Sequence, residues 1–327
     1  MTSRESLCIL TAAYNDWASL KALLPLLDRT LAGAAAGARV VVMDDGSLDP
    51  APDDLLDGHD FAFIREVTVL TLVRNLGNQR ALSIGVGYVA AEIDCDYLVV
   101  MDADHEDRPE VVPTLLTAAR REEGRKIVFA SRTERSEGPV FKALYGLYKK
   151  LYGMLTGMPI SIGNFSVVPR RLIRRLAGVW EIGLHFPAGV MKARLPFTSL
   201  GAARGRRLHG TTNMNLVNLV VHGFSGLAVH AEVVGVRVVL GSLALAVAVF
   251  ALDLVLFYGR LFSDVTIAMG WTSQITLTFA VLLLQVFMPG LLMMFMGLHQ
   301  RIQRQIIPLV DYKTFILETL TLTPSGH

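Results

Sequence analysis

The chain has 327 residues, 52% of them hydrophobic, and its mean hydropathy of +0.44 excludes a purely water-soluble protein of ordinary composition. Part of it is therefore expected to lie in a lipid bilayer. The formal net charge of +2 selects no class of partner by itself. The two cysteines, Cys8 and Cys95, lack the spacing of a metal site or a disulfide framework, which favours a reducing compartment.

The first 135 residues alternate short β-branched runs with segments of helix length. Strands are predicted at 7–13, 39–43, 67–73, 97–101 and 126–131, and helices at 17–36, 78–92 and 109–123. This alternation is typical of a mostly parallel, doubly wound α/β sheet. Pro109 suits the first turn of the third helix.

Polar residues follow each predicted strand directly. They include Ala12 to Asp16 after the first strand, Asp44 and Asp45 after the second, Arg74 and Asn75 after the third, Asp102 to Asp107 after the fourth, and Arg132 and Arg135 after the fifth. Ligands of such sheets bind beyond the carboxyl ends of the strands. Crowded carboxylates repel unless a cation compensates them, so the Asp-Ala-Asp of residues 102–104 predicts a hard divalent ion, Mg²⁺ or Mn²⁺, bridging a diphosphate.

The acidic pair after the second strand has two interpretations. Asp44 or Asp45 can accept hydrogen bonds from the ribose or base of a nucleotide. Alternatively, the run Asp-Asp-Gly-Ser only turns the chain and caps the next element. Residues 170–207 carry nine cations and the single acid Glu181, a composition that suits a phosphate or an anionic membrane surface, the alternative being a solvated basic face.

Two long apolar segments lie at 238–258 and 275–298, each long enough to span a bilayer. Their connecting loop is short and has few charges, whereas Arg237 precedes the pair and Arg301, Arg304 and Lys313 follow it. The positive-inside rule then predicts that both termini are cytoplasmic. No signal peptide is recognised before them, so the residues before about 230 are expected in the cytoplasm. Residues 211–230 resemble an amphipathic helix of the membrane interface.

Several motifs together resemble those of family 2 glycosyltransferases with the GT-A fold. They are Ala12-Ala13-Tyr14-Asn15-Asp16, the pair Asp44 and Asp45, the run Asp102-Ala103-Asp104-His105-Glu106-Asp107-Arg108-Pro109, the segment 74–91, Arg132, and Arg207 with Gly210 and Thr212. With the paired carboxyl-terminal spans, they are similar to polyprenyl-phosphate glycosyltransferases of the dolichyl-phosphate mannose synthase type. The resemblance covers nearly the whole chain and is most specific in residues 8–135.

The resemblance implies an α/β, Rossmann-like GT-A domain at 1–210, an interface helix at 211–233, a two-helix transmembrane hairpin at 234–300 and a cytoplasmic tail at 301–327. It implies roles for a set of residues: nucleotide-sugar binding by Ala12, Tyr14, Asp16, Asp44, Asp45, Asn75, Asp102 and Ala103; metal binding by Asp102, Asp104 and Glu106; catalysis by Asp104, Arg132 and Arg207; and phosphate or acceptor binding by Arg132, Arg135, Arg207 and Asn213.

The function implied is an inverting, metal-dependent transfer of sugar from a UDP- or GDP-sugar donor to a polyprenyl phosphate. The enzyme would be an integral protein of a bacterial inner or plasma membrane, would have no nucleic-acid partner, and could form a homo-oligomer. Two alternatives remain: transfer to a hydroxyl of another membrane lipid, or a catalytically silent scaffold that binds nucleotide sugars. A nicotinamide-dependent oxidoreductase is disfavoured because the glycines at 85–87 lie inside a predicted helix.

The sequence departs from the family pattern mainly on the acceptor side. Where the family often shows Asp-x-Gly-Asp-Phe-Arg, this chain has Ser161, Ile162, Gly163, Asn164, Phe165 and Ser166. Asn213 replaces a lysine, and Glu106 replaces a glutamine. The donor, the sugar and the lipid are not identified by these residues.

Overall fold

The computed structural model describes residues 5–32, 37–132, 139–158, 162–203, 205, 216–262 and 270–324. It divides into two compact units. The first comprises Met1–Lys142, Ser161–Val229 and Gln305–His327, and the second comprises Ala143–Ile160 and His230–Arg304. The chain thus leaves the first unit, forms most of the second, and returns to the first near its carboxyl end.

The first unit is built on an eight-stranded mixed sheet with the order β7-β5-β6-β4-β1-β2-β3-β8. The strands are β1 (Ser6–Ala13), β2 (Gly37–Asp44), β3 (Ile64–Leu72), β4 (Tyr97–Val100), β5 (Ile127–Arg132), β6 (Ile162–Pro169), β7 (Phe197–Ala202) and β8 (Ile316–Leu322). Strands β1 to β4 are parallel, whereas β6 runs antiparallel between β4 and β5, and β8 runs antiparallel beside β3. The five predicted strands and the α/β class are confirmed; β6, β7 and β8 were not predicted.

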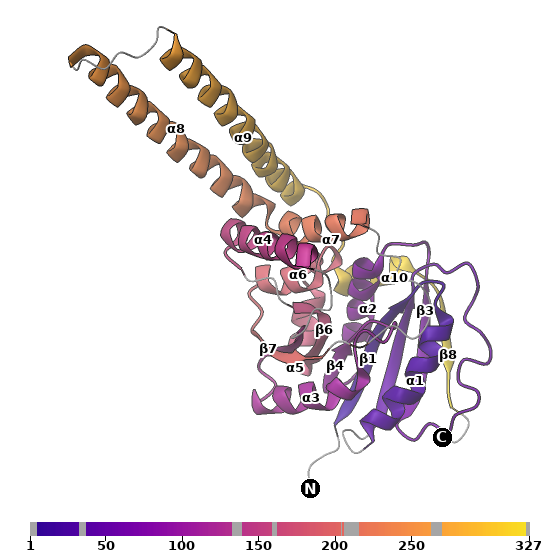
Figure 1. Ribbon diagram of the computed structural model, residues 1–327. Helices are drawn as coiled ribbons and strands as arrows, with labels where there is room; N and C mark the ends of the chain where they lie inside the picture. The colour runs from indigo at the N-terminus through magenta and orange to yellow at the C-terminus, as the bar shows by residue number, and fades with distance from the viewer. Residues whose placement is uncertain are drawn as a thin grey trace. The chain divides into compact units, whose positions relative to one another are not determined.

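Helices cover both faces of the sheet (Figure 1). The helices of the first unit are α1 (Trp17–Leu31), α2 (Asn78–Glu92), α3 (Val112–Arg121) after a 3₁₀ turn at Pro109–Val111, α5 (Arg170–Ala177), α6 (Phe186–Lys192) after a second turn at Trp180–Gly183, α7 (Leu216–Val229), which packs against α6, and α10 (Pro308–Phe315). Side chains alternate along a strand, so β1 presents Leu7 and Ile9 to a core shared with α1 and α3. The opposite face presents Leu10 and Met43 to α2, where Gly85 allows a close approach.

The segment after the second long helix returns to the sheet. It forms α10, which packs against α2, and then β8, whose Thr319 pairs with Leu70 of β3. Figure 1 shows α10 beside α2 and β8 at the edge of the sheet. The first unit therefore needs residues from both ends of the chain.

The second unit contains α8 (Ala231–Phe262), α9 (Trp271–Ile302) and most of α4 (Pro139–Thr156). Helices α8 and α9 pack against each other along their length (Figure 1). Their segments Ala231–Gly259 and Ser273–His299 have mean hydropathies of 2.5 and 2.2 and are largely unburied, which fits a bilayer as their surroundings. Thr276 Oγ1 donates to Asp253 Oδ1 at 3.0 Å, so the aspartate within the first apolar helix has a partner on the second. The two predicted apolar helices are confirmed.

Candidate active site

The predicted site residues of the first four strands lie at one edge of the sheet. Because β1, β2, β3 and β4 are parallel, with Ala13 opposite Asp44 and Asp44 opposite Thr71, their carboxyl ends open on the same side. The predicted residues at these ends or directly after them are Ala12, Tyr14, Asp16, Asp44, Asp45, Asn75, Asp102, Ala103, Asp104 and Glu106. The sheet thus brings together the residues that the sequence assigns to the nucleotide sugar and to the metal.

Asp44 and Asp45 are both buried, and both hold backbone in place. Asp44 Oδ1 accepts from the N–H of Ser47 at 2.9 Å, and the Asp45 carboxylate accepts from the N–H groups of Leu76 at 2.7 Å and Gly77 at 2.9 Å. Burial raises the pKa of Asp45 above its ordinary value, and Asp44 adds to the rise, although the two backbone donors oppose it. The pair therefore turns the chain and holds neighbouring backbone, as the second of the two interpretations of this motif predicts. The remaining lone pairs of the two carboxylates can still accept hydrogen bonds from a ligand.

Hydrogen bonds and close packing join the loops that follow β1, β2 and β3 around this acidic pair. Asn15 donates its backbone N–H to Ser47 Oγ at 2.9 Å and accepts from the N–H of Leu48 at 2.8 Å. Gly46 has a φ of +74°, and a Cβ there would lie 2.8 Å from the backbone nitrogen of Asn75. Only glycine fits that approach and that backbone conformation. Asn75 and Tyr14 remain exposed beside it, where a ligand can reach them.

The acidic loop after β4 is a compact turn closed by its own groups. Asp107 Oδ2 accepts from the N–H of Asp102 at 2.9 Å, and Asp104 Oδ1 accepts from the N–H of Glu106 at 3.0 Å. Asn78, at the start of α2, donates its side-chain amide to Asp102 Oδ1 at 3.2 Å. The loop thus presents Asp102 and Asp104 with their carboxylates already oriented.

His105 and Gly205 connect the acidic loop to other segments of the first unit. His105 is buried, has a φ of +65°, and places its Nε2 3.3 Å from the carbonyl oxygen of Ser19 in α1. Gly205 donates its N–H to the carbonyl of Glu106 at 2.9 Å, and a Cβ on it would lie 2.1 Å from the His105 oxygen. A larger residue than glycine at 205 would displace the acidic loop.

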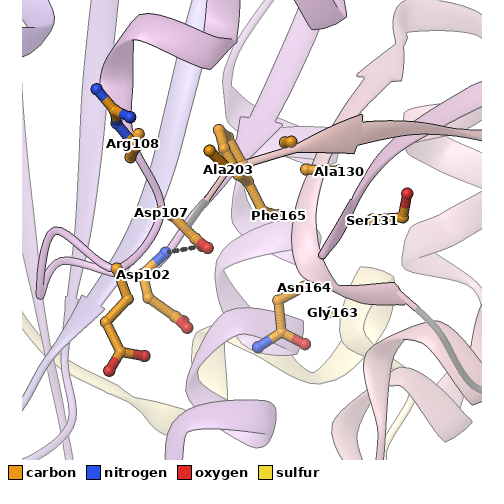
Figure 2. Close-up of a pocket in the computed structure, with 11 residues that line it drawn as sticks. Asp102, Asp107, Arg108, Ala130, Ser131, Gly163, Asn164, Phe165 and Ala203 are labelled. Carbon is orange, nitrogen blue, oxygen red and sulfur yellow. Dashed lines mark hydrogen bonds between the residues drawn. The ribbon is translucent and has the colours of Figure 1, made fainter. Parts of the chain in front are cut away.

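A polar pocket opens beside the acidic loop, between the ends of β4, β5, β6 and β7 (Figure 2). Its lining includes Asp102, Arg108, Ser131 and Asn164. Asn164 comes from the start of β6, and it lies across from the acidic loop because β6 runs antiparallel to β4, with Ser166 opposite Val100. An amide and a hydroxyl therefore line the same pocket as Asp102.

Several predicted residues lie wholly or partly outside the described part of the structure. Arg132 ends β5, and its backbone pairs with Ala202 of β7, but its side chain is outside the described part of the structure. Arg135, Arg207 and Asn213 also lie outside the described residues, as do residues 211–215 of the expected interface helix. Their assigned roles stay predictions.

Part of the basic segment has acidic partners. Arg170 Nη2 lies 2.5 Å from Asp94 Oδ1, and Lys192 Nζ lies 3.3 Å from Glu181 Oε1 and 5.6 Å from the ring centroid of Trp180. Counting acids within 170–207 alone omitted Asp94, which the fold brings to Arg170. Arg171, Arg174 and Arg175 on α5 are exposed.

The geometry of the acidic loop fits a divalent ion that a substrate helps to hold. Among the described residues no group of three acidic, histidine or cysteine side chains forms a closed metal site. Mg²⁺ is often bound in proteins by one or two carboxylates together with substrate phosphates and water. Asp102 and Asp104, on one tight turn at the open edge of the sheet, match that arrangement.

Sequence reasoning did not assign roles to Asn78, Gln79, Ser131, His105 and Gly205. Asn78 and Gln79 begin the helix after β3 and so face the same edge as the acidic loop. The position of a polar pair directly after a glycine and at the start of a predicted helix could have indicated them. His105 and Gly205 carry no such signal, because their contacts, His105 with Ser19 and Gly205 with Glu106, join segments far apart in the sequence.

Residues 8–193, more than half of the chain, match the family described as "Glycosyl transferase family 2". The chain therefore belongs to this family, and its mixed sheet with an acidic edge is the GT-A-like α/β fold predicted from the motifs.

Curated proteins also match the chain. It is 28% identical over 173 residues to an uncharacterised glycosyltransferase of Synechocystis sp., with 52% of each chain covered, so it spans about half the length of that relative. It is 25% identical over 263 residues to the undecaprenyl-phosphate 4-deoxy-4-formamido-L-arabinose transferase of Serratia proteamaculans, with 77% of this chain and 78% of that one covered.

Among solved structures, the chain is similar to glucosyl-3-phosphoglycerate synthase from Mycobacterium tuberculosis, crystallised with Mn²⁺, UDP-glucose and phosphoglyceric acid. The match has a TM-score of 0.49 and 18% identity, and it covers 71% of this chain and 80% of the other.

Proposed function

We propose that this chain is a membrane-bound glycosyltransferase that moves a sugar from a nucleotide-activated donor, a UDP- or GDP-sugar, to a polyprenyl phosphate. The observation that carries the proposal is the combination, in one family 2 chain, of an acidic sheet edge with two unburied apolar helices of membrane-spanning length. The name of the Serratia relative, which specifies undecaprenyl phosphate, supports the class of acceptor.

The order of the strands supports a division of the site into a donor half and an acceptor half. Asp44, Asp45 and Asn75 follow β2 and β3, and we assign the nucleotide to this half. Asp102 and Asp104 follow the central strand β4, where a diphosphate would lie. The pocket with Ser131 and Asn164 lies beyond β4, on the side of β5, β6 and β7, and we assign the sugar and the acceptor to it.

A divalent ion, when bound, would neutralise charge on the leaving diphosphate. Asp102 and Asp104 are the residues that would hold it, with Glu106 as a further predicted ligand. Asp107, through its carboxylate on the N–H of Asp102, and Gly205, through its N–H on the carbonyl of Glu106, would keep this loop in its shape during turnover. Arg132, Arg135 and Arg207 are the predicted phosphate ligands, which would act by charge and by paired hydrogen bonds.

In the reaction, an oxygen of the lipid phosphate attacks the anomeric carbon of the sugar. The bond from that carbon to the donor diphosphate breaks, and the nucleoside diphosphate leaves with the electron pair, so a single displacement inverts the anomeric configuration. A phosphate monoester has its second pKa near ~6 and arrives as an anion, so a general base is not required. This accounts for asparagine at position 164, where the family often has an acid.

The experiment is transfer of label from a panel of radiolabelled nucleotide sugars to undecaprenyl phosphate by the purified, full-length protein with Mn²⁺. Label extracted into the organic phase with one donor, and lost on addition of a chelator, supports the proposal. Label that appears equally without the lipid phosphate, or that is carried by a lipid alcohol, would contradict the acceptor assignment. If the protein neither hydrolyses any donor nor transfers sugar to any acceptor, the catalytically silent scaffold is favoured.

A further inference from the structure

The residues at the start of α2 contact the loops of two strands that are not neighbours in the sheet. Strand β1 separates β2 from β4, so the loops after β2 and β4 share no strand pairing. Leu76 and Gly77 donate their N–H groups to the carboxylate of Asp45, after β2. Asn78 donates its side-chain amide to Asp102 Oδ1, after β4. Three consecutive residues therefore connect the acidic pair to the acidic loop.

The backbone that carries Asn78 is held on both sides of this residue. Before it, the N–H groups of residues 76 and 77 are bound to the acidic pair at 2.7 and 2.9 Å. After it, Gln79 accepts from the N–H of Phe186 at 2.7 Å and donates to Asn164 Oδ1 at 3.2 Å. Asn78 itself is exposed, but only its two side-chain torsions remain free. Its bond to the acidic loop therefore costs little conformational entropy.

Asp102 is held at two points by groups from different elements. Its N–H donates to Asp107 Oδ2 at 2.9 Å within the acidic loop (Figure 2), and its Oδ1 accepts from Asn78 Nδ2 at 3.2 Å. An ionised carboxylate can only accept, so the atom of the Asn78 amide that faces it is the nitrogen. The first bond fixes the backbone of Asp102, and the second fixes the rotation of its carboxylate. Together they set the direction in which Asp102 presents its oxygens.

The direction of the carboxylate matters for the divalent ion of the proposed function. Mg²⁺ requires near-octahedral geometry and is held by one or two carboxylates together with substrate phosphates. Side chains that bind metals are oriented by a further hydrogen-bond partner, and loss of this partner lowers metal affinity roughly 10–100-fold. Asp104 has such a partner inside the acidic loop, the N–H of Glu106. Asn78 supplies one to Asp102 from outside the loop.

We propose that Asn78 is a positioning residue, whose side-chain amide orients the Asp102 carboxylate for the divalent ion. This inference rests on the proposed function and adds a residue to which the sequence motifs assign no role. Asn78 acts through Asp102, and the short segment that carries it is also bound to Asp45. The direction of the metal ligand is thereby tied to the half of the sheet edge that we assign to the nucleotide.

The test measures Mn²⁺ binding by the full-length protein in detergent, with UDP and with GDP in separate series. Water proton relaxation reports the bound ion, because Mn²⁺ enhances it far more on a macromolecule than on a free nucleotide. Asn78→Leu keeps a side chain of similar size without a donor. It should raise the Kd of Mn²⁺ about tenfold, the lower end of the range for such partners, because the bond is exposed. Asn78→Gln keeps an amide donor and should bind Mn²⁺ more tightly than Asn78→Leu.

Two controls separate positioning from other roles of Asn78. Thr276→Val removes a neutral donor from Asp253, a bond of the same kind in the second unit, and should leave the Kd of Mn²⁺ unchanged. Binding of the nucleotide in EDTA, measured by equilibrium dialysis, should be the same for Asn78→Leu and the wild type. Weaker binding in EDTA would mean that Asn78 contacts the nucleotide and would overturn the proposal. Equal Mn²⁺ binding by Asn78→Gln and Asn78→Leu, or a lower unfolding temperature of Asn78→Leu with an unchanged Kd, would overturn it as well.

Asp102→Asn distinguishes failure of this inference from failure of the proposed function. The substituted side chain can still accept from Asn78 but is no longer a charged ligand, so Mn²⁺ binding should be lost. If the wild type transfers sugar and Asp102→Asn loses the ion, but Asn78→Leu binds it as the wild type does, the inference is wrong and the function stands. If the wild type transfers no sugar, but Asn78→Leu binds the ion about tenfold more weakly and Asn78→Gln does not, the function is wrong and the positioning role stands. Mn²⁺ binding by Asp102→Asn as tight as by the wild type would overturn both the metal assignment and the inference.

Discussion

The hydroxyl of Tyr312 donates a hydrogen bond to the carboxylate of Glu92, although 220 positions separate the two residues in the sequence. This bond joins α10 to the end of α2, and Lys313 Nζ lies 3.3 Å from the same carboxylate. The Tyr312 bond and, next, the Lys313 ammonium hold the pKa of Glu92 below its ordinary value. Above them, the ring of Tyr88 packs edge-on against Tyr312. The segment after the second apolar helix is thus held to the first unit by specific side-chain contacts.

The packing of α10 against α2 can be tested at Gly87, where a Cβ would lie 2.1 Å from the carbonyl oxygen of Pro308. Gly87→Ala should force α10 away from α2 and lower the free energy of unfolding by about 1–3 kcal/mol, the usual cost of overpacking. Gly146→Ala, on a helix with nothing within 4 Å of the added Cβ, is the matched control and should not destabilise. Equal unfolding temperatures for Gly87→Ala and the wild type would show that α10 is not packed against α2.

Asp104→Asn tests the metal assignment. The asparagine oxygen can still accept from the N–H of Glu106, so the loop should keep its fold, but a charged metal ligand is lost. We expect transfer to fall by more than about 100-fold, since loss of groups that merely support metal ligands costs 10–100-fold. Turnover is measured over a Mn²⁺ titration, with unfolding temperature as the check on folding. Near-normal turnover at every Mn²⁺ concentration would remove Asp104 from the metal site.

The sequence predicted five of the strands because each is a short apolar run that ends in polar residues. Strand β8 lacked such a signal, since its middle residues are exposed and it becomes a strand by pairing with β3 from far along the chain. Strand β6 contains Gly163 and Asn164 and ends in Pro169, which weaken the local preference for a strand. Pairing with β4 and β5 on both sides overrides that preference.

The sequence predicted the positions of those site residues that lie at the ends of strands. Asp44, Asp45, Asp102 and Asp104 could be placed at one edge because parallel strands share a direction. The sequence singled out Asn164 as a departure from the family pattern but could not say what its amide does. That depends on Gln79 and on the N–H of Phe186, a group contributed by the start of α6, and no local pattern indicates such a contact.

Asp45 predicts how donor binding depends on pH. Burial raises the pKa of this carboxyl, so it takes up a proton at a pH above the ordinary aspartate value of about 3.9. The native state binds this proton more tightly than the unfolded chain, so lowering the pH through the raised pKa does not destabilise the fold through this group. It does remove a charged acceptor from the nucleotide half.

We therefore expect the KM for the donor to rise on acidification, at a higher pH than protonation of an exposed aspartate would cause. Asp45→Asn should have a KM about tenfold higher near neutral pH and should not show this rise. Steady-state kinetics across pH at saturating Mn²⁺ measure both, with Asp54→Asn as a control, because Asp54 lies on the surface beside Lys21. A donor KM that changes with pH in the same way in Asp45→Asn and the wild type would exclude Asp45 from nucleotide binding.

The return of the chain to its first unit predicts the membrane topology. Helix α7 before α8, and α10 with β8 after α9, belong to the same compact unit, so they must lie on the same side of the bilayer. Two spans satisfy this requirement, and a single span does not. The basic residues Arg237 and Arg304 flank the pair on that side, which the positive-inside rule makes cytoplasmic.

Reporter fusions after His327 and near Asp264, in the loop between the spans, should therefore report opposite sides, with the His327 fusion cytoplasmic. A fusion at Lys126, within the first unit, is the control and should match the one after His327. The same side for His327 and Asp264 would mean that α8 and α9 do not form a spanning hairpin.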